Sequence, residues 1–288
     1  MVRLVAATLF LACAGALRAP SRLIGRAMAA RSASQPRVVP MMMAWEEPSF
    51  SPVTVKSIKP STGRGHYEVT IEASAAFLAS YTTPGQYVQL RPSADVKAGF
   101  FVIASAPRKD GVMLDFLIKE VEATLWLTNA KAGAEALMCA PTGKGYVTSA
   151  ITNPDVTCTN VAFCAAGTGI AALKALIEAD GADGASLIGL GGAGRTAQLF
   201  YGCQSLDVMA YTDMFEAWEK RGVQVVPVLS RAPEFDGAKG YVQSLLASHL
   251  KAPAQTVIVL CGGKEMQIAV KEEATKLGIP ESSVLTNF

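Results

Sequence analysis

The sequence predicts two folded modules, a six-stranded antiparallel β-barrel followed by an α/β module with a parallel sheet. Between residues 51 and 150, short β-type runs are broken by turn residues, which is typical of a small barrel. After residue 155, apolar runs alternate with segments of helical periodicity, which is typical of a parallel sheet covered on both faces. At 288 residues, 50% of them hydrophobic, the chain is long enough for both modules.

The first 43 residues have the composition of targeting sequence. Residues 1–16 hold a basic residue, an apolar run and the small-residue exit Ala14-Gly15-Ala16, which is the layout of a signal peptide. Residues 17–43 carry five arginines and no acidic residue, a transit-peptide composition. The combination resembles the bipartite plastid-targeting presequence of algae with secondary plastids. We expect a plastid location, with secretion as the alternative, and no membrane span in the mature chain.

The charge balance of the mature chain argues against nucleic-acid partners. Removing residues 1–43 takes away six of the 26 lysines and arginines and none of the 24 acidic residues, which leaves a net charge of about −4. Cys13 leaves with the signal, and the five remaining cysteines have no CxxC spacing. We therefore expect neither a disulfide framework nor a metal site.

The elements of the predicted barrel are bounded by turn residues such as Pro84-Gly85. One helical segment, residues 124–133, interrupts the strands and ends at Gly133. The expected strands are residues 52–58, 66–74, 85–90, 99–105, 112–119 and 135–143.

The second module follows a polar, proline-containing stretch at residues 151–160, where we place the domain boundary. We expect the first domain to cover residues 51–150 and the second to cover residues 155–288. The expected strands of the parallel sheet are residues 160–165, 197–202, 223–230 and 256–262, and the expected helices are residues 169–180, 207–222, 241–250 and 264–278.

A glycine turn at residues 167–170 links the first apolar run of this module to its first helix. Such a turn brings backbone N–H groups and a helix N-terminus close to a pyrophosphate, so it predicts a nucleotide site. A tight turn without a ligand is the alternative. Residues 189–194 match a dinucleotide pattern more literally, but the segment after them has strand character, so we interpret them as a flexible loop.

Seven short motifs occur in one order along the mature chain. In that order and rough spacing they resemble ferredoxin-NADP reductase-like flavoenzymes. The resemblance implies an FAD-binding barrel at residues 51–150 and an NAD(P)-binding α/β domain at residues 155–288, with hydride passing between NADP(H) and the flavin. The cofactors would carry the chemistry and the protein would align them. The motifs are TTPGQYVQL, PTGKGY, AAGTGIAA, LFYG, LSR, YVQ and CGGKEM.

The same resemblance implies contacts to the nicotinamide nucleotide. The glycine loop would lie along its pyrophosphate, and the CGGKEM motif would lie near the nicotinamide ring. The implied residues are Gly167, Thr168, Gly169, Ile170, Cys261, Gly262 and Met266. Cys261 and the terminal Phe288 are the implied catalytic residues. Phe288 would act as a gate over the flavin ring; closing the edge of the last strand is the alternative.

A second group of residues favours NADP(H) over NAD(H). In the family pattern, cationic and hydroxyl groups surround the adenosine 2′-phosphate, and an arginine with a lysine suits a dianion. The alternative is that the two cations are solvated surface charges. The residues that match the pattern are Ser230, Arg231, Lys239, Tyr241 and Gln243.

The flavin motifs match less well. The residues that the resemblance implies as flavin contacts are Phe101, Ile103, Ser105 and Thr124. Gly99, Val102 and Val121 stand where the family has an arginine, a serine and a glycine. Losing one charge-assisted hydrogen bond and one neutral one would weaken flavin binding by about two to three orders of magnitude. FAD, FMN and no flavin all stay open, and a compensating cation could come from Lys97, Arg108 or Lys119.

Two functions therefore remain open. The first is a plastid flavin-dependent NAD(P)H oxidoreductase that serves an electron-carrier protein or a small acceptor. Any iron–sulfur centre would come from a partner, since the chain has no cysteine cluster for one. The second is a flavin-free NADP(H)-binding sensor or assembly protein with the same fold.

Overall fold

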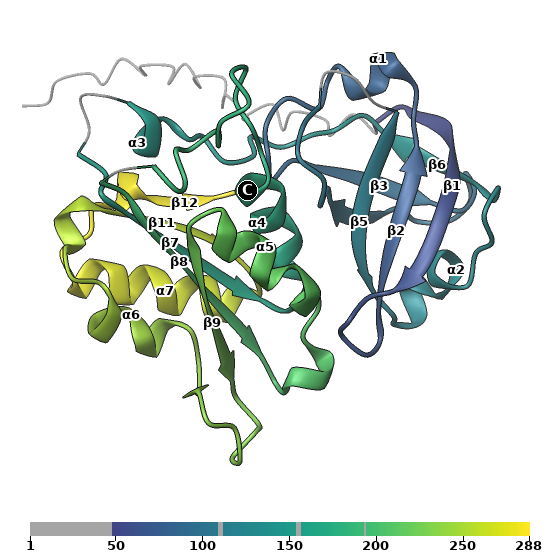
Figure 1. Ribbon diagram of the computed structural model, residues 1–288. Coiled ribbons are helices and arrows are strands. Elements are labelled where there is room, and N and C mark those ends of the chain that lie inside the picture. Colours follow the sequence, from purple (N-terminus) through teal and green to yellow (C-terminus); the bar gives the residue numbers. More distant parts are fainter. Residues whose placement is uncertain (1–47, 109–111, 154–156, 193) are drawn as a thin grey trace, which may run out of the picture. The chain divides into compact units, whose positions relative to one another are not determined.

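A computed structural model of the chain describes residues 48–108, 112–153, 157–192 and 194–288. The signal and transit segments predicted at residues 1–16 and 17–43 lie outside these ranges. The described part holds two six-stranded sheets, one antiparallel and one parallel (Figure 1). This confirms the predicted fold class.

The antiparallel sheet is an almost closed barrel. Its strand order is β4-β3-β6-β1-β2-β5, and a single bridge between Ile103 and Phe116 joins its two edges. Inward positions alternate along the strands, so that Val69 and Ile71 are fully buried while Thr70 between them is not. The strands are β1 (Phe50–Pro60), β2 (His66–Glu72), β3 (Tyr87–Arg91), β4 (Gly99–Val102), β5 (Met113–Lys119) and β6 (Glu135–Cys139).

The helices associated with the barrel are short. The helix expected over residues 124–133 is reduced to η1 (Glu122–Thr124) and α2 (Leu125–Thr128). The reason is that the amide of Gly133 donates to Val55 O, so the chain must turn back to the barrel before a longer helix can form. The sequence did not predict two further short helices: α1 (Ala75–Leu78), whose Leu78 packs into the barrel core, and α3 (Ser149–Thr152), whose Ile151 packs into a core cluster of the parallel sheet.

The parallel sheet has the strand order β10-β9-β8-β7-β11-β12. Its central strands are buried on both faces, and in β11 every residue is buried, as expected for a sheet covered on both sides. The strands are β7 (Asn160–Ala166), β8 (Thr196–Cys203), β9 (Val223–Leu229), β10 (Ala238–Lys239), β11 (Thr256–Cys261) and β12 (Val284–Thr286).

Helices cover both faces of this sheet. Residues of α4 (Ile170–Ile177) and α5 (Phe215–Lys220) pack into one apolar cluster, and residues of α6 (Gln243–His249) and α7 (Lys264–Lys276) pack into another (Figure 1). Between them the two clusters use alternate residues of β7: Val161, Phe163 and Ala165 on one side, and Ala162 and Cys164 on the other.

The prediction of a helix over residues 207–222 is wrong for the first half of that range. Tyr211 has a φ of 60°, which no α-helix contains. The 3-10 turns η3 (Leu206–Val208) and η4 (Thr212–Met214) flank it, and only α5 is helical. Residues 207–212 instead hydrogen-bond to the β1–β2 turn, where Thr62 Oγ1 contacts Met209 O and accepts the amide of Thr212.

Candidate functional site

The candidate nucleotide site lies where the order of the parallel strands reverses. From β7 the chain proceeds to β8 and β9 on one side of the sheet, then returns to β11 and β12 on the other. The loops that follow β7 and β11 therefore diverge from neighbouring strand ends. In open α/β sheets such a switch point is where ligands bind.

The loop after β7 brings its backbone very close to β11. It forms the 3-10 turn η2 (Gly167–Gly169), which leads into α4. A Cβ atom on Gly169 would lie 2.5 Å from the carbonyl carbon of Cys261 and 2.9 Å from the amide of Gly262. Gly167 has a φ of +54°, and nothing lies within 4 Å of where its Cβ would be. Residue 169 must be glycine for the two loops to meet, and Gly167 leaves open space beside the N-terminus of α4.

Three predicted residues of the two loops differ in exposure. Thr168 is exposed, Ile170 is fully buried in the core, and Met266 is half-buried. A Cβ atom on Gly262 would overlap the Met266 methyl group. The structure thus brings the predicted GTGI and CGGKEM residues together; the Ile170 side chain lies in the core, and its amide donates to Gly167 O.

Cys261 ends β11 with its side chain 5% exposed. Burial raises the pKa of the Cys261 thiol to about 11, and a hydrogen bond with the Tyr146 hydroxyl opposes that shift in part. The one proton of this hydroxyl can instead go to Leu260 O, which lies 3.3 Å away. Cys261 is therefore a neutral thiol at pH 7, which excludes a thiolate nucleophile in this state.

The residues predicted for the adenosine 2′-phosphate follow β9 and β10. Ser230 Oγ lies 3.4 Å from Cys203 O, and the amide of Arg231 donates to Gln204 O. Lys239 Nζ donates to Pro233 O at 2.6 Å. Tyr241 is 66% exposed. The Oε1 atom of Gln243 is buried and accepts no hydrogen bond from the described residues.

Two acidic residues that the sequence interpretation left out lie in this same loop. Glu234 and Asp236 are both exposed between Arg231 and Lys239. Two positive and two negative side chains give residues 231–239 no net charge. The charge argument for NADP(H) is therefore weaker than the two cations alone suggest.

On the barrel, β4 presents a different aromatic residue from the predicted one. Phe101 packs against the barrel core, and its Cε2 atom would lie 2.9 Å from a Cβ on Gly99. Phe100 points the other way, is 60% exposed, and packs edge-on against Tyr87 at 5.7 Å between ring centroids. The period-2 alternation of a strand could have identified this side, once the buried face was known.

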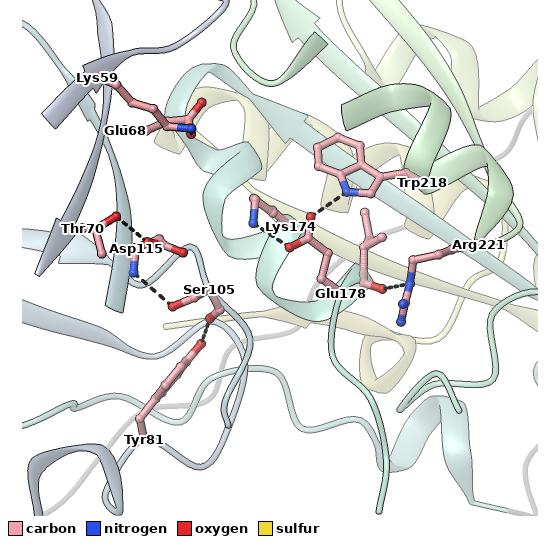
Figure 2. A network of polar contacts seen from close by, with 11 residues as sticks. Lys59, Glu68, Thr70, Tyr81, Ser105, Asp115, Lys174, Glu178, Trp218 and Arg221 are labelled. Carbon is pink, nitrogen blue, oxygen red and sulfur yellow. Dashed lines mark hydrogen bonds and ion pairs between the residues drawn. The ribbon is translucent and has the colours of Figure 1, made fainter. Parts of the chain in front are cut away.

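Ile103 and Ser105 are structural residues in this conformation. Ile103 is fully buried in the barrel core, and its amide donates to Gln86 O. Ser105 is 7% exposed. Its Oγ accepts the amide of Asp115, and its carbonyl accepts the Tyr81 hydroxyl at 2.6 Å (Figure 2). The side chain of Ile103 lies in the core, so the cofactor contact predicted for this residue stays a prediction for its backbone alone.

The predicted phosphate turn at Val121 to Thr124 is occupied by its own hydrogen bonds. Thr124 Oγ1 lies 2.6 Å from Lys119 O and 3.0 Å from Val121 O, and it accepts the amide of Val121 at 3.0 Å. The Thr124 side chain caps η1, so its hydroxyl is not available to a ligand.

The C-terminus joins the parallel sheet to the barrel. Asn287 is 1% exposed, and its Nδ2 donates to Gly85 O at 3.1 Å. Its Oδ1 is buried without a partner among the described residues. Phe288 packs on Tyr87 at 5.3 Å between ring centroids and stays 60% exposed. Phe100, Tyr87 and Phe288 thus form an aromatic face.

A chain of contacts links the aromatic face to Cys261. Gly85, which holds Asn287, lies so close to the ring of Tyr146 that a Cβ atom there would be 2.8 Å from Cδ2. Tyr146 is fully buried and hydrogen-bonds to Leu260 and Cys261. The aromatic face therefore lies beside the switch point.

The polar network of α4 fixes the helix that follows the glycine loop. Glu178 accepts the Trp218 indole N–H at 2.9 Å and pairs with Lys174 at 2.5 Å (Figure 2). Arg221 Nε donates to Ile177 O at 3.0 Å (Figure 2). The contacts from Trp218 and Arg221 hold the C-terminal end of α4, while the Lys174–Glu178 pair lies within the helix itself.

These contacts fit two ligands unequally. The open space beside Gly167 and the unpartnered Oε1 of Gln243 fit a nicotinamide nucleotide, whose carboxamide and adenine amines are donors. The aromatic face fits a planar ring. The phosphate end of a flavin nucleotide does not fit β4 or the turn before η1.

The remaining features of the described residues do not add a site. A cavity of about 500 Å³ contains Arg108, one of the cations named above as a compensating charge for a flavin, but none of the other predicted cofactor residues; its lining includes Leu78, Tyr81, Thr82, Arg108, Asp180 and Leu187. Within the described ranges, no group of three or more His, Cys, Asp or Glu residues has the arrangement of a metal site. No helix in this part of the chain is long and apolar enough to cross a membrane.

Comparison with known proteins supports the nucleotide site. Residues 163–272 match the family model of the oxidoreductase NAD-binding domain. The fruit protein pKIWI502 of Actinidia deliciosa is 30% identical over 251 residues, which cover 82% of this chain and 76% of that protein.

Solved reductases share the fold at low sequence identity. The cytochrome P450 reductase GcoB of Amycolatopsis has a TM-score of 0.67 at 17% identity, with 84% of this chain and 70% of that chain covered. A ferredoxin NADP⁺ reductase from Neisseria gonorrhoeae, solved with bound FAD and NADP, has a TM-score of 0.66 at 16% identity, with 84% of this chain and 100% of that chain covered.

Proposed function

This chain belongs to the ferredoxin-NADP reductase-like family, and from that premise we propose that it is an oxidoreductase. It would pass hydride or electrons between a nicotinamide nucleotide and a flavin, and on to an acceptor. The observation that carries the proposal is the meeting of the two loops at the switch point, where Gly169 lies against Cys261 and Gly167 leaves open space beside the N-terminus of α4. A bound flavin would supply the exchange between two-electron and one-electron chemistry.

The chain's own residues bind and orient the nucleotide. The backbone of residues 167–170 and the N-terminus of α4 would receive the pyrophosphate. The nicotinamide would then lie near Cys261, whose neutral thiol adds no charge beside the ring. The exposed ring of Phe288 would be displaced from Tyr87 as the nicotinamide enters.

The test is reduction of added flavin under anaerobic conditions. The full chain is mixed with FAD or FMN and then with NADPH, and the absorbance of the oxidised flavin is followed. We expect bleaching that needs the protein. If NADPH binds in calorimetry but no flavin is ever bleached, the oxidoreductase proposal is wrong.

For the nucleotide, we propose NADP(H) over NAD(H), on the basis of Arg231 and Lys239. The variant Arg231→Ala is expected to weaken NADP⁺ binding about tenfold and leave NAD⁺ binding unchanged, since one charge-assisted hydrogen bond contributes about 1.5–3 kcal/mol. The control is Lys271→Ala, an exposed lysine on α7. An equal loss of affinity for NADP⁺ and NAD⁺ in Arg231→Ala would contradict the preference for NADP(H).

A second function is favoured by the poor phosphate fit at Gly99 and Val121. A flavin-free sensor or assembly protein would bind NADPH in calorimetry, yet show no diaphorase activity toward ferricyanide, even with added flavin. Activity that depends on added flavin would instead support the oxidoreductase.

For location, we propose that residues 1–43 direct the chain to a plastid, because a signal-type segment precedes an arginine-rich, acid-free one. A fluorescent protein fused after residue 43 is expected in the plastid of an alga with secondary plastids. Export of the fusion to the medium would support secretion instead.

A further inference from the structure

The phosphate end of a flavin nucleotide is held by positive charge, by hydroxyl groups or by free backbone N–H groups. The family resemblance places these groups in β4 and in the turn before η1. In this chain each place is filled by contacts of a different kind.

At β4, an aromatic ring fills the space beside residue 99. A Cβ atom on Gly99 would lie 2.9 Å from Cε2 and 3.2 Å from Cζ of Phe101. Phe101 packs against the barrel core, so its burial holds the ring there. Glycine at this position provides no positive charge, and a larger side chain would have to displace Phe101.

At the turn before η1, the Thr124 hydroxyl and three of the five amides of residues 121–125 are already used. The Thr124 hydroxyl has one proton, which goes to Lys119 O or Val121 O, and it accepts the amide of Val121. The amides of Thr124 and Leu125 both donate to Val121 O. This hydroxyl and these three amides are therefore unavailable to a phosphate.

The charge of this turn also opposes an anion. Glu122 is an exposed carboxylate at the first position of η1, and Glu120 is exposed two residues earlier. Lys119 is the positive side chain of this segment. One positive and two negative groups give residues 119–124 a net charge of −1, which repels a phosphate.

A surface for the flavin ring is nevertheless present. The rings of Phe100 and Phe288 are each 60% exposed. Both pack against the ring of Tyr87, with centroids 5.7 Å and 5.3 Å from its centroid. Exposed aromatic rings bind planar rings by stacking, without regard to what the distant end of the ligand carries.

We propose that this chain recognises a flavin by its isoalloxazine ring alone, and that it takes riboflavin, FMN and FAD as exchangeable substrates instead of retaining one as a resident cofactor. The inference rests on the proposed function. In the reaction NAD(P)H is oxidised to NAD(P)⁺, and the flavin accepts the hydride with one proton from solvent. The reduced flavin then dissociates.

Equilibrium titration of the full chain with riboflavin, FMN and FAD, followed by flavin fluorescence, tests this inference. We expect the three dissociation constants to agree within about threefold, and bound flavin to be lost on gel filtration. One charge-assisted hydrogen bond to phosphate is worth about 10- to 150-fold in affinity. FMN or FAD binding about tenfold tighter than riboflavin, or tighter still, would overturn the inference and leave the proposed function standing.

The two failures are distinguishable. If no flavin binds while calorimetry still detects NADP⁺, the proposed function fails together with the inference. If a phosphate preference appears, Lys97→Ala, Arg108→Ala and Lys119→Ala would identify the cation responsible.

A variant pair tests the aromatic face directly. Phe100→Ala is expected to weaken the binding of riboflavin, FMN and FAD by the same factor, about two- to tenfold, because one aromatic contact is lost. The matched control is Leu125→Ala, which removes an exposed apolar side chain at the turn that does not contact the ligand in this proposal. A loss confined to FAD or FMN in either variant, or unchanged riboflavin binding in Phe100→Ala, would overturn it.

Discussion

At the scale of single residues, Gly169 is the position with the least freedom. The backbone of the loop after β7 meets the backbone at the end of β11 there, and no side chain fits between them. Both neighbours are main-chain atoms, which cannot rotate away as a flexible side chain can.

We predict that Gly169→Ala destabilises the protein by about 1–3 kcal/mol and weakens NADP⁺ binding, because the two loops must separate. Thermal unfolding and calorimetry measure the two effects. The matched control is Gly192→Ala, in the other glycine-rich loop, where a Cβ would meet only Gly189 O at 3.4 Å. If both variants bind NADP⁺ with the same affinity, nucleotide binding does not depend on the loop after β7.

Phe288 gives a second prediction at this scale. Its ring is exposed and covers Tyr87, while Asn287 holds the tail to Gly85 independently. Deleting Phe288 alone is expected to tighten NADP⁺ binding several-fold if the ring must move before the nicotinamide enters. An unchanged dissociation constant would mean that Phe288 only closes the end of the chain after β12.

At the scale of elements, the β1–β2 turn and residues 207–212 form a close backbone contact. A Cβ atom on Gly63 would lie 2.8 Å from both Ala210 N and Val208 O. The neighbouring ion pair of Arg64 with Asp207, at 2.6 Å, is exposed on both sides. Exposed ion pairs contribute about 0–1 kcal/mol, whereas a backbone clash costs about 1–3 kcal/mol.

We therefore predict that Gly63→Ala lowers the free energy of unfolding more than Arg64→Ala does. Urea denaturation at moderate salt measures both. The opposite ranking would show that the ion pair, and not the close approach, holds this turn in place.

The same contact explains what the periodicity of residues 207–222 could not predict. Apolar spacing there favours one long helix, but Tyr211 adopts a left-handed conformation. That break lets residues 207–212 reach the β1–β2 turn, far away in sequence. Local spacing carries no information about such a partner.

At the scale of the whole molecule, buried thiols make the folded state less stable at alkaline pH. Burial raises the pKa of Cys261 to about 11 and the pKa of Cys164 to about 12. Unfolded thiols have a pKa of about 8.5. Between these values the folded state binds more protons than the unfolded state, so the free energy of unfolding falls as pH rises.

We predict that the contribution of these thiols to the free energy of unfolding is constant below about pH 8. The free energy of unfolding should then fall progressively from about pH 8.5 to 11. Urea unfolding at several pH values measures it. Cys164→Ala should flatten the dependence, although it lowers stability at neutral pH by leaving a small cavity. An identical slope in Cys164→Ala would show that other groups cause the alkaline loss.

The site could be predicted in part. The glycine turn, the CGGKEM segment and the positions after β9 and β10 follow from sequence order, because parallel strands end at the same edge of a sheet. The choice between Phe100 and Phe101 did not follow, since two adjacent phenylalanines give no alternation to show which one faces the core. Ser105 and Thr124 have the expected hydroxyl groups, yet backbone partners use them.

The sequence by itself determined the two modules, the strand and helix alternation and the glycine loop, since these depend on local spacing and on residues with special backbone freedom. Only the tertiary structure decided that Gly169 lies against Cys261, that Phe101 fills the space beside Gly99, and that Asn287 joins Gly85. Each of these contacts joins groups whose closeness depends on how strands pack or how one ring rotates, and spacing along the chain does not specify that.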